Sequence, residues 1–181
     1  MDVLLVVVAL AVPVIALVFE HVGNVRITER HHSHHDTYVV SAEFTRSIVL
    51  AMAFMAALGL LIAWLCEQDV FGADEGTVLT FFDAFLVTSF LLWAAICRYR
   101  VSTFGDCMAV TPLVGPKVWV RYDRIDRLEW SGLRAGTGFR NLVVWVDGRR
   151  AVTLLGIVDV EQILMSIDRF DLLPTSGRRH A

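Results

Sequence analysis

The chain has 181 residues, of which 56% are hydrophobic, and a formal net charge of −3. This apolar content exceeds that of an ordinary soluble domain. The chain as a whole is therefore not a soluble globular domain. The charge is divided unevenly, because residues 1–97 carry three Arg and ten Asp or Glu, whereas residues 98–181 carry thirteen Lys or Arg and nine Asp or Glu.

Three apolar runs, at about 3–19, 47–66 and 78–97, supply most of the hydrophobic residues of the first half. A helix needs about 20 apolar residues to cross the hydrocarbon of a bilayer. The runs therefore predict three transmembrane helices, and residues 1–97 form the transmembrane region. We expect the first run to be retained and not cleaved as a signal peptide, because Asp2 replaces the positive segment that starts such a peptide.

The loops between the runs predict an orientation. The 20–46 loop contains three Arg, and two more follow the third run, whereas the 67–77 loop contains neither Lys nor Arg. By the positive-inside rule, the 20–46 loop and the C-terminal half face the cytoplasm, and the N-terminus lies outside. The predicted location is the cytoplasmic (inner) membrane. The three cysteines then share no oxidising compartment, and no disulfide is expected.

Small residues recur in the second run at a spacing that allows close helix packing. Ala53 and Ala57 form one small-xxx-small step, and Gly59 and Ala63 form another. The partner helix belongs either to the same chain or to a second copy. Asp83 lies within the third run, where a carboxylate is costly. A structural or interfacial role is the favoured interpretation, and a proton or ion role is the alternative.

Short alternating stretches replace the long runs after residue 97. They predict antiparallel strands at 98–104, 107–111, 118–122, 125–130, 142–146 and 151–155. The pair Asp147-Gly148 predicts a two-residue hairpin turn. Apolar residues then recur at helical spacing from 158 to 170, with Asp159 as a candidate N-cap. We expect a domain over 98–172 with six or seven strands and one closing helix, followed by a disordered tail at 173–181.

The order of these elements resembles the bacterial pleckstrin-homology-like (PH-like) domains of small membrane proteins. The resemblance rests on Arg98-Tyr-Arg-Val-Ser-Thr directly after a helix, on Val120-Arg-Tyr-Asp-Arg-Ile-Asp-Arg-Leu-Glu, and on the Asp-Gly hairpin with its closing helix. It implies a partly closed antiparallel sheet that a C-terminal helix caps. It also implies a scaffold or interaction module, often oligomeric, and not an enzyme. The first hairpin, Thr103-Phe-Gly-Asp-Cys, lacks Lys and Arg, which argues against binding of inositol-lipid headgroups.

The tract from 29 to 36 is rich in potential metal ligands. Imidazole and carboxylate groups bind zinc, nickel or copper. A solvated loop beside the membrane is the favoured interpretation, and the alternatives are metal binding and a pH-dependent headgroup contact. The candidate metal ligands are His31, His32, His34, His35 and Asp36.

No other pattern predicts chemistry. The glycine-rich stretch at 132–138 lacks the strand-to-helix context of a phosphate loop and is interpreted as a hairpin tip. Trp119, Trp130 and Trp145 are expected in a core or an interface, not as stacking platforms for nucleic acid. The sequence therefore predicts a non-enzymatic scaffold without catalytic residues or a cofactor. We expect it to contact the lipid bilayer and to bind a protein partner or itself, with metal binding as the alternative function.

Overall fold

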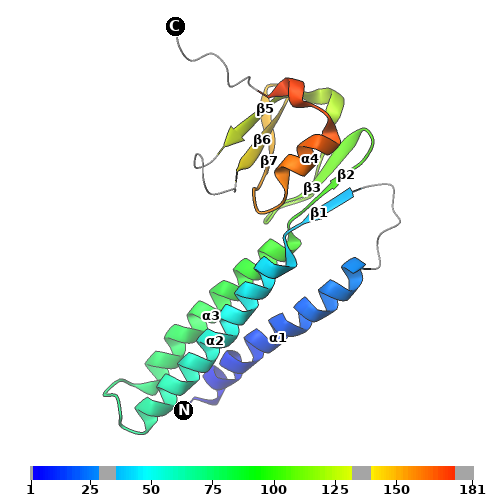
Figure 1. Ribbon diagram of the computed structural model, residues 1–181. Coiled ribbons are helices and arrows are strands. Elements are labelled where there is room, and N and C mark those ends of the chain that lie inside the picture. Colours follow the sequence, from blue (N-terminus) through cyan, green and yellow to red (C-terminus); the bar gives the residue numbers. More distant parts are fainter. Residues whose placement is uncertain (1, 29–35, 132–139, 174–181) are drawn as a thin grey trace. The chain divides into compact units, whose positions relative to one another are not determined.

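The computed structural model describes residues 2–28, 36–131 and 140–173. The chain divides into two compact units, which are described separately. One unit contains the three long helices, and the other contains all seven strands of the described residues together with the short helix α4 (Figure 1).

The helical unit consists of α1 (Val3–Thr28), α2 (Ala42–Glu67) and α3 (Glu75–Arg98). All three are long and apolar enough to cross a membrane, so the three predicted spans are found as helices. Helix α1 is longer than its apolar run and continues through residues that the sequence assigned to the 20–46 loop. Glu20, the first residue after that run, contacts Thr45 and Arg46 of α2.

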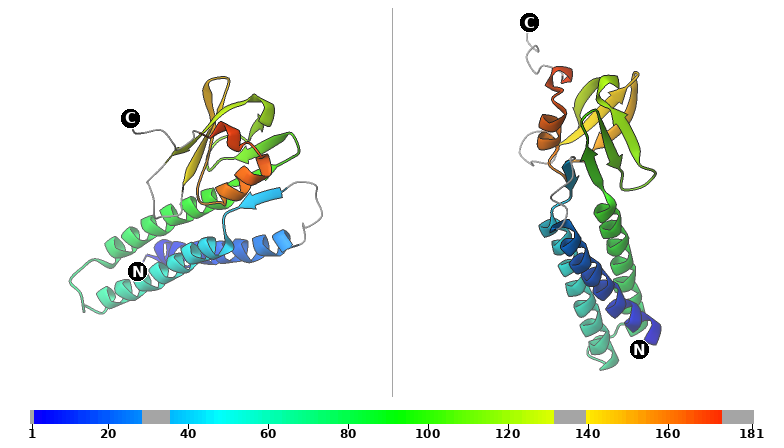
Figure 2. Two further views of the ribbon diagram at one scale, coloured as in Figure 1. Left: turned by 45° about the horizontal axis from the view of Figure 1, so that its top comes forward. Right: turned by 90° about the vertical axis from the view of Figure 1, so that its right-hand side faces the viewer.

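The three helices of this unit run alongside one another (Figure 2). Each buries one face and exposes apolar residues on its other faces. Helix α1 contributes Ala9 and Ala16 to a core that also contains Met52 and Ala56 of α2 and Leu86 of α3. Large hydrophobic side chains cover the outer surface. A helix that is apolar all round is buried in a protein core or in lipid. The unit therefore has the surface of a membrane-spanning bundle.

The two small-residue steps of α2 lie in different environments. Gly59 and Ala63 are buried within the chain, whereas Ala57 is exposed. A Cβ atom on Gly59 would lie 2.7 Å from Cγ of Phe82 and 2.8 Å from its Cβ. The glycine therefore permits a close approach of α2 and α3. The sequence allowed a partner helix in the same chain or in a second copy. Gly59 contacts α3 of the same chain.

The second unit contains two antiparallel sheets. The first has the order β1-β2-β3-β4, and the second has the order β5-β6-β7. The strands after α3 match the six predicted from the alternation. Their bounds are β2 (Arg100–Thr103), β3 (Cys107–Thr111), β4 (Val118–Arg121), β5 (Ile125–Ser131), β6 (Asn141–Val146) and β7 (Arg149–Leu154).

The remaining strand, β1 (Asp36–Val39), comes from the segment between α1 and α2. It pairs with β2, and Val39 lies opposite Arg100. Two polar contacts fix it further, because the Thr37 hydroxyl lies 3.2 Å from that of Ser102 and the Tyr38 hydroxyl lies 2.6 Å from that of Ser166. The sequence assigned these residues to a loop. In the structure, the residues of β1 belong to the second unit, whose other strands begin at residue 100.

The predicted turn and helix cap are confirmed. Asp147 and Gly148 both have positive φ, at 51° and 69°, as a two-residue turn between β6 and β7 requires. Helix α4 (Val160–Ile167) begins after Asp159, whose carboxylate accepts a hydrogen bond from the Gln162 backbone at 2.9 Å. The helix buries four apolar side chains, namely Val160, Ile163, Leu164 and Ile167. A short 3-10 turn, η2 (Phe170–Leu172), follows.

Candidate interaction surface

An open, mainly apolar depression lies on the second unit between the β3–β4 turn and strand β7. Its volume is about 380 Å³. One wall comes from the turn and the other from β7, and Tyr99 lies beside them. The lining residues are Tyr99, Pro112, Leu113, Val114, Arg150, Ala151, Val152, Thr153 and Leu155. No local pattern in the sequence predicts this depression, because its two walls are about 40 residues apart along the chain.

Strand β7 is the last strand of its sheet, so its outer edge is not paired with a further strand among the described residues. Arg150 lies along this strand, because its Nε and Nη2 atoms donate to the Thr153 hydroxyl at 2.9 and 2.5 Å. At the far end of the strand, the Tyr99 hydroxyl accepts a hydrogen bond from the Leu155 backbone at 2.8 Å. End strands are the places where an extended peptide can add to a sheet.

The β3–β4 turn carries the most exposed apolar side chain of this unit. Val114 is 83% exposed, and the neighbouring Gly115 has a φ of 104°. The carbonyl of Gly115 accepts a hydrogen bond from Nη2 of Arg98 at 2.6 Å. This bond joins the turn to the residue at which α3 ends.

Trp119, which lies on β4 after the turn, forms an aromatic pair with Phe104. The Trp119 ring stacks on Phe104 with a centroid separation of 5.5 Å, and the Lys117 ammonium lies 4.4 Å from the Trp119 ring centre. Trp119 is 59% exposed, so it is not part of the core. An exposed tryptophan beside a lysine is typical of a surface that meets a partner or a membrane interface.

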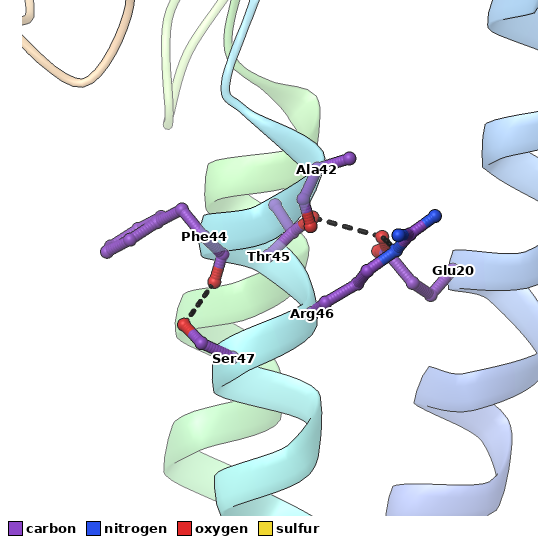
Figure 3. Close-up of polar contacts among 6 residues, drawn as sticks. All are labelled: Glu20, Ala42, Phe44, Thr45, Arg46 and Ser47. Carbon is purple, nitrogen blue, oxygen red and sulfur yellow. Dashed lines mark hydrogen bonds and ion pairs between the residues drawn. The ribbon is translucent and has the colours of Figure 1, made fainter.

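The helical unit contains a polar cluster that the sequence analysis did not identify. Glu20 of α1 meets Thr45 and Arg46 of α2 (Figure 3). The Thr45 hydroxyl lies 3.1 Å from Glu20 Oε1, and Arg46 Nε lies 3.8 Å from the same atom. The sequence contains a signal for this cluster, because the acidic Glu20 directly follows the first apolar run and the basic Arg46 directly precedes the second. The cluster ties α1 to the start of α2.

Asp83 lies on the buried face of α3, between Phe82 and Leu86, and is 6% exposed. Neither of its carboxylate oxygens has a hydrogen-bond partner among the described residues. Its side chain therefore faces the interior of the helical unit. A buried carboxylate without a hydrogen-bond partner is costly.

The predicted metal tract is outside the described residues except for its last member. His31, His32, His34 and His35 lie in the 29–35 segment. Asp36 is the first residue of β1, and its backbone carbonyl accepts a bond from the Thr103 hydroxyl at 3.4 Å. Within the described part of the chain, no group of three His, Cys, Asp or Glu residues is arranged to hold a metal. The glycine-rich stretch at 132–138 also lies outside it.

The cysteines of the described residues are free thiols. Burial, a hydrogen bond to Asp106 and the charge of that carboxylate raise the pKa of Cys107. A thiol with a raised pKa remains protonated at neutral pH and is a poor nucleophile. Cys107 therefore does not have the environment of a catalytic cysteine.

Comparisons of the chain with protein families, with curated proteins and with solved structures found no match.

Proposed function

We propose that the protein is a non-enzymatic, membrane-anchored interaction protein of the cytoplasmic membrane. Its strand-rich unit is a PH-like domain that faces the cytoplasm and binds a protein partner or a second copy of the chain. The three apolar helices provide the anchor.

The order of elements supports the PH-like interpretation. A four-stranded antiparallel sheet is followed along the chain by a three-stranded one and then by an amphipathic helix. The family that the sequence resembles combines a bent antiparallel sheet with such a helix. In this chain the helices α2 and α3 stand between the first and second strands, because β1 precedes them and β2 follows them.

The depression along β7 is the observation that carries the proposed function. It offers an apolar surface beside the edge of an end strand, and Arg150 lies at the same edge. An extended peptide would bond to the edge of β7 through its backbone, and its apolar side chains would enter the depression. Arg150 would favour a peptide with an acidic residue.

Site-specific photo-crosslinking in native membranes tests this proposal. A photoreactive amino acid at Arg150 should give adducts with a partner or with a second copy, and the adduct mass distinguishes the two. The matched control is Glu129 on β5, the strand at the opposite end of the same sheet. Adducts that form equally at both positions, or at neither, would contradict the proposed surface.

The alternative function is metal binding or sensing by the tract from His31 to Asp36. It is supported by the density of imidazole and carboxylate groups directly before β1. Zinc titration of the purified protein tests it, as described in the Discussion.

A further inference from the structure

The β3–β4 turn, residues 112–117, is held at the end of a membrane-spanning helix. Helix α3 ends at Arg98, and Nη2 of that residue donates to the Gly115 carbonyl at 2.6 Å. One residue, Tyr99, separates the helix from β2. Both the covalent connection and the hydrogen bond therefore hold this turn next to Arg98, the last residue of α3.

The composition of the turn suits a lipid interface. Val114 projects with 83% of its surface exposed, and Pro112 and Pro116 stand on either side of it. A proline has a fixed φ and no backbone N–H, so each of the two prolines removes one donor that an apolar medium would leave unpaired.

The residues after the turn suit the headgroup layer. Lys117 lies over the face of Trp119, which stacks in turn on Phe104. Tryptophan is enriched at membrane interfaces because its ring is apolar and its N–H is polar, and lysine extends its ammonium toward the phosphates. Trp119 lies opposite Ala109 in the sheet, so it is farther from the turn than Val118, which lies opposite Val110. Along the chain, the apolar tip, the cation and the aromatic ring therefore follow one another in the order of increasing distance from the tip of the turn.

We propose that the β3–β4 turn inserts into the bilayer interface, with Val114 among the upper acyl chains and with Lys117 and Trp119 at the level of the lipid phosphates. The inference rests on the proposed membrane placement of α3. The inference goes beyond the proposed interaction function because it assigns the β3–β4 turn to lipid. Because Val114 also lines the depression, its insertion would leave β7 and Arg150, and not the tip of the turn, to bind the peptide ligand.

Depth-dependent fluorescence quenching tests the proposal on the full chain in lipid vesicles. The three native cysteines are replaced by serine, and Val114→Cys carries an environment-sensitive fluorophore. Vesicles contain phosphatidylcholine and phosphatidylglycerol, with a phospholipid that bears a quencher near the top of its acyl chain. Two matched positions serve as controls. Asp106→Cys lies in the turn at the opposite end of β3, and Leu91→Cys lies on the outer face of α3, where Leu91 is 63% exposed.

We expect strong quenching at positions 114 and 91 and severalfold weaker quenching at position 106. Quenching at 91 but not at 114 would overturn the inference while leaving the membrane anchor intact. The absence of quenching at 91 would overturn both. In addition, Arg98→Gln should weaken quenching at 114 and leave quenching at 91 unchanged, because it removes the cation that holds Gly115.

A second measurement uses the unmodified chain, in case the cysteine-free variant fails to fold. Photoreactive lipids with the reactive group near the headgroup are incorporated into the same vesicles, and adducts are mapped by mass spectrometry after trypsin digestion. We expect lipid adducts on the peptide 101–117 and not on the peptide 151–169. Adducts on neither peptide, or on both alike, would contradict insertion of the turn.

Discussion

The close approach of α2 and α3 at Gly59 makes a sharp prediction about stability. In Gly59→Ala, the new methyl group would lie 2.7 Å from Cγ of Phe82 and 2.8 Å from its Cβ, well inside the 3.4–4 Å range of ordinary contact. The Cβ atom of Phe82 is fixed to the backbone of α3. A change of side-chain rotamer therefore cannot relieve the overlap, and the two helices must separate by more than half an ångström.

The magnitude follows from two opposing effects. Overpacking of a close contact costs about 1–3 kcal/mol. Alanine offsets about 1 kcal/mol of this, because its helix propensity exceeds that of glycine. Because Cβ of Phe82 cannot move without its backbone, we place the overpacking cost in the upper part of this range, at about 2–3 kcal/mol. The net loss is then about 1–2 kcal/mol, which corresponds to a fall in Tm of about 2–8 °C for a chain of this size. The larger side chain of Gly59→Leu should cost more.

Thermal unfolding in mild detergent, followed by circular dichroism, measures the effect. The matched control is Gly72→Ala in the α2–α3 loop, where an added Cβ atom meets nothing within 4 Å. The control should unfold at the wild-type temperature. An unchanged or higher Tm for Gly59→Ala would refute the close packing of α2 on α3.

Three further predictions concern the strand-rich unit and the metal tract. Asp159→Ala should lower the stability of that unit by about 1 kcal/mol in chemical denaturation, because the N-cap of α4 is lost, and Asp159→Asn should retain most of it. Burial raises the pKa of Tyr122 from 10.0 to about 12. The unfolded chain therefore releases this proton at a lower pH than the folded chain, and stability should fall between pH 10 and 12. Tyr122→Phe should flatten that part of the curve of stability against pH. An unaltered slope would contradict the raised pKa of Tyr122. If the tract binds zinc, replacing His31, His32, His34 and His35 by Ala should abolish binding in calorimetric titration, and unchanged affinity would remove the metal hypothesis.

Much of the fold was predictable because its signals are local. Run length and composition alone predict the three helices. The Asp147-Gly148 turn and the Asp159 cap were predictable because each depends on the conformation of a few adjacent residues. In both cases the physical requirement, a positive φ or an unpaired backbone N–H, restricts the choice of residue.

The missed features depend on contacts between distant parts of the chain. Strand β1 has four residues, too few for a clear alternation, and the helices α2 and α3 separate it from its partner β2. The pairing of Glu20 with Thr45 depends on the packing of α1 against α2. Alternation divides a strand into two faces but does not show which face is covered. The exposure of Trp119 and the depression beside β7 were therefore not predictable.

Labelling with a membrane-impermeant maleimide in intact cells tests the central claim most directly, namely that three spans anchor a cytoplasmic interaction domain. In a cysteine-free background, Gly72→Cys reports on the α2–α3 loop and Asp106→Cys reports on the β2–β3 turn. The account predicts that position 72 reacts in intact cells and that position 106 reacts only after the membrane is permeabilised. Reaction of both positions in intact cells, or of position 106 alone, would contradict it.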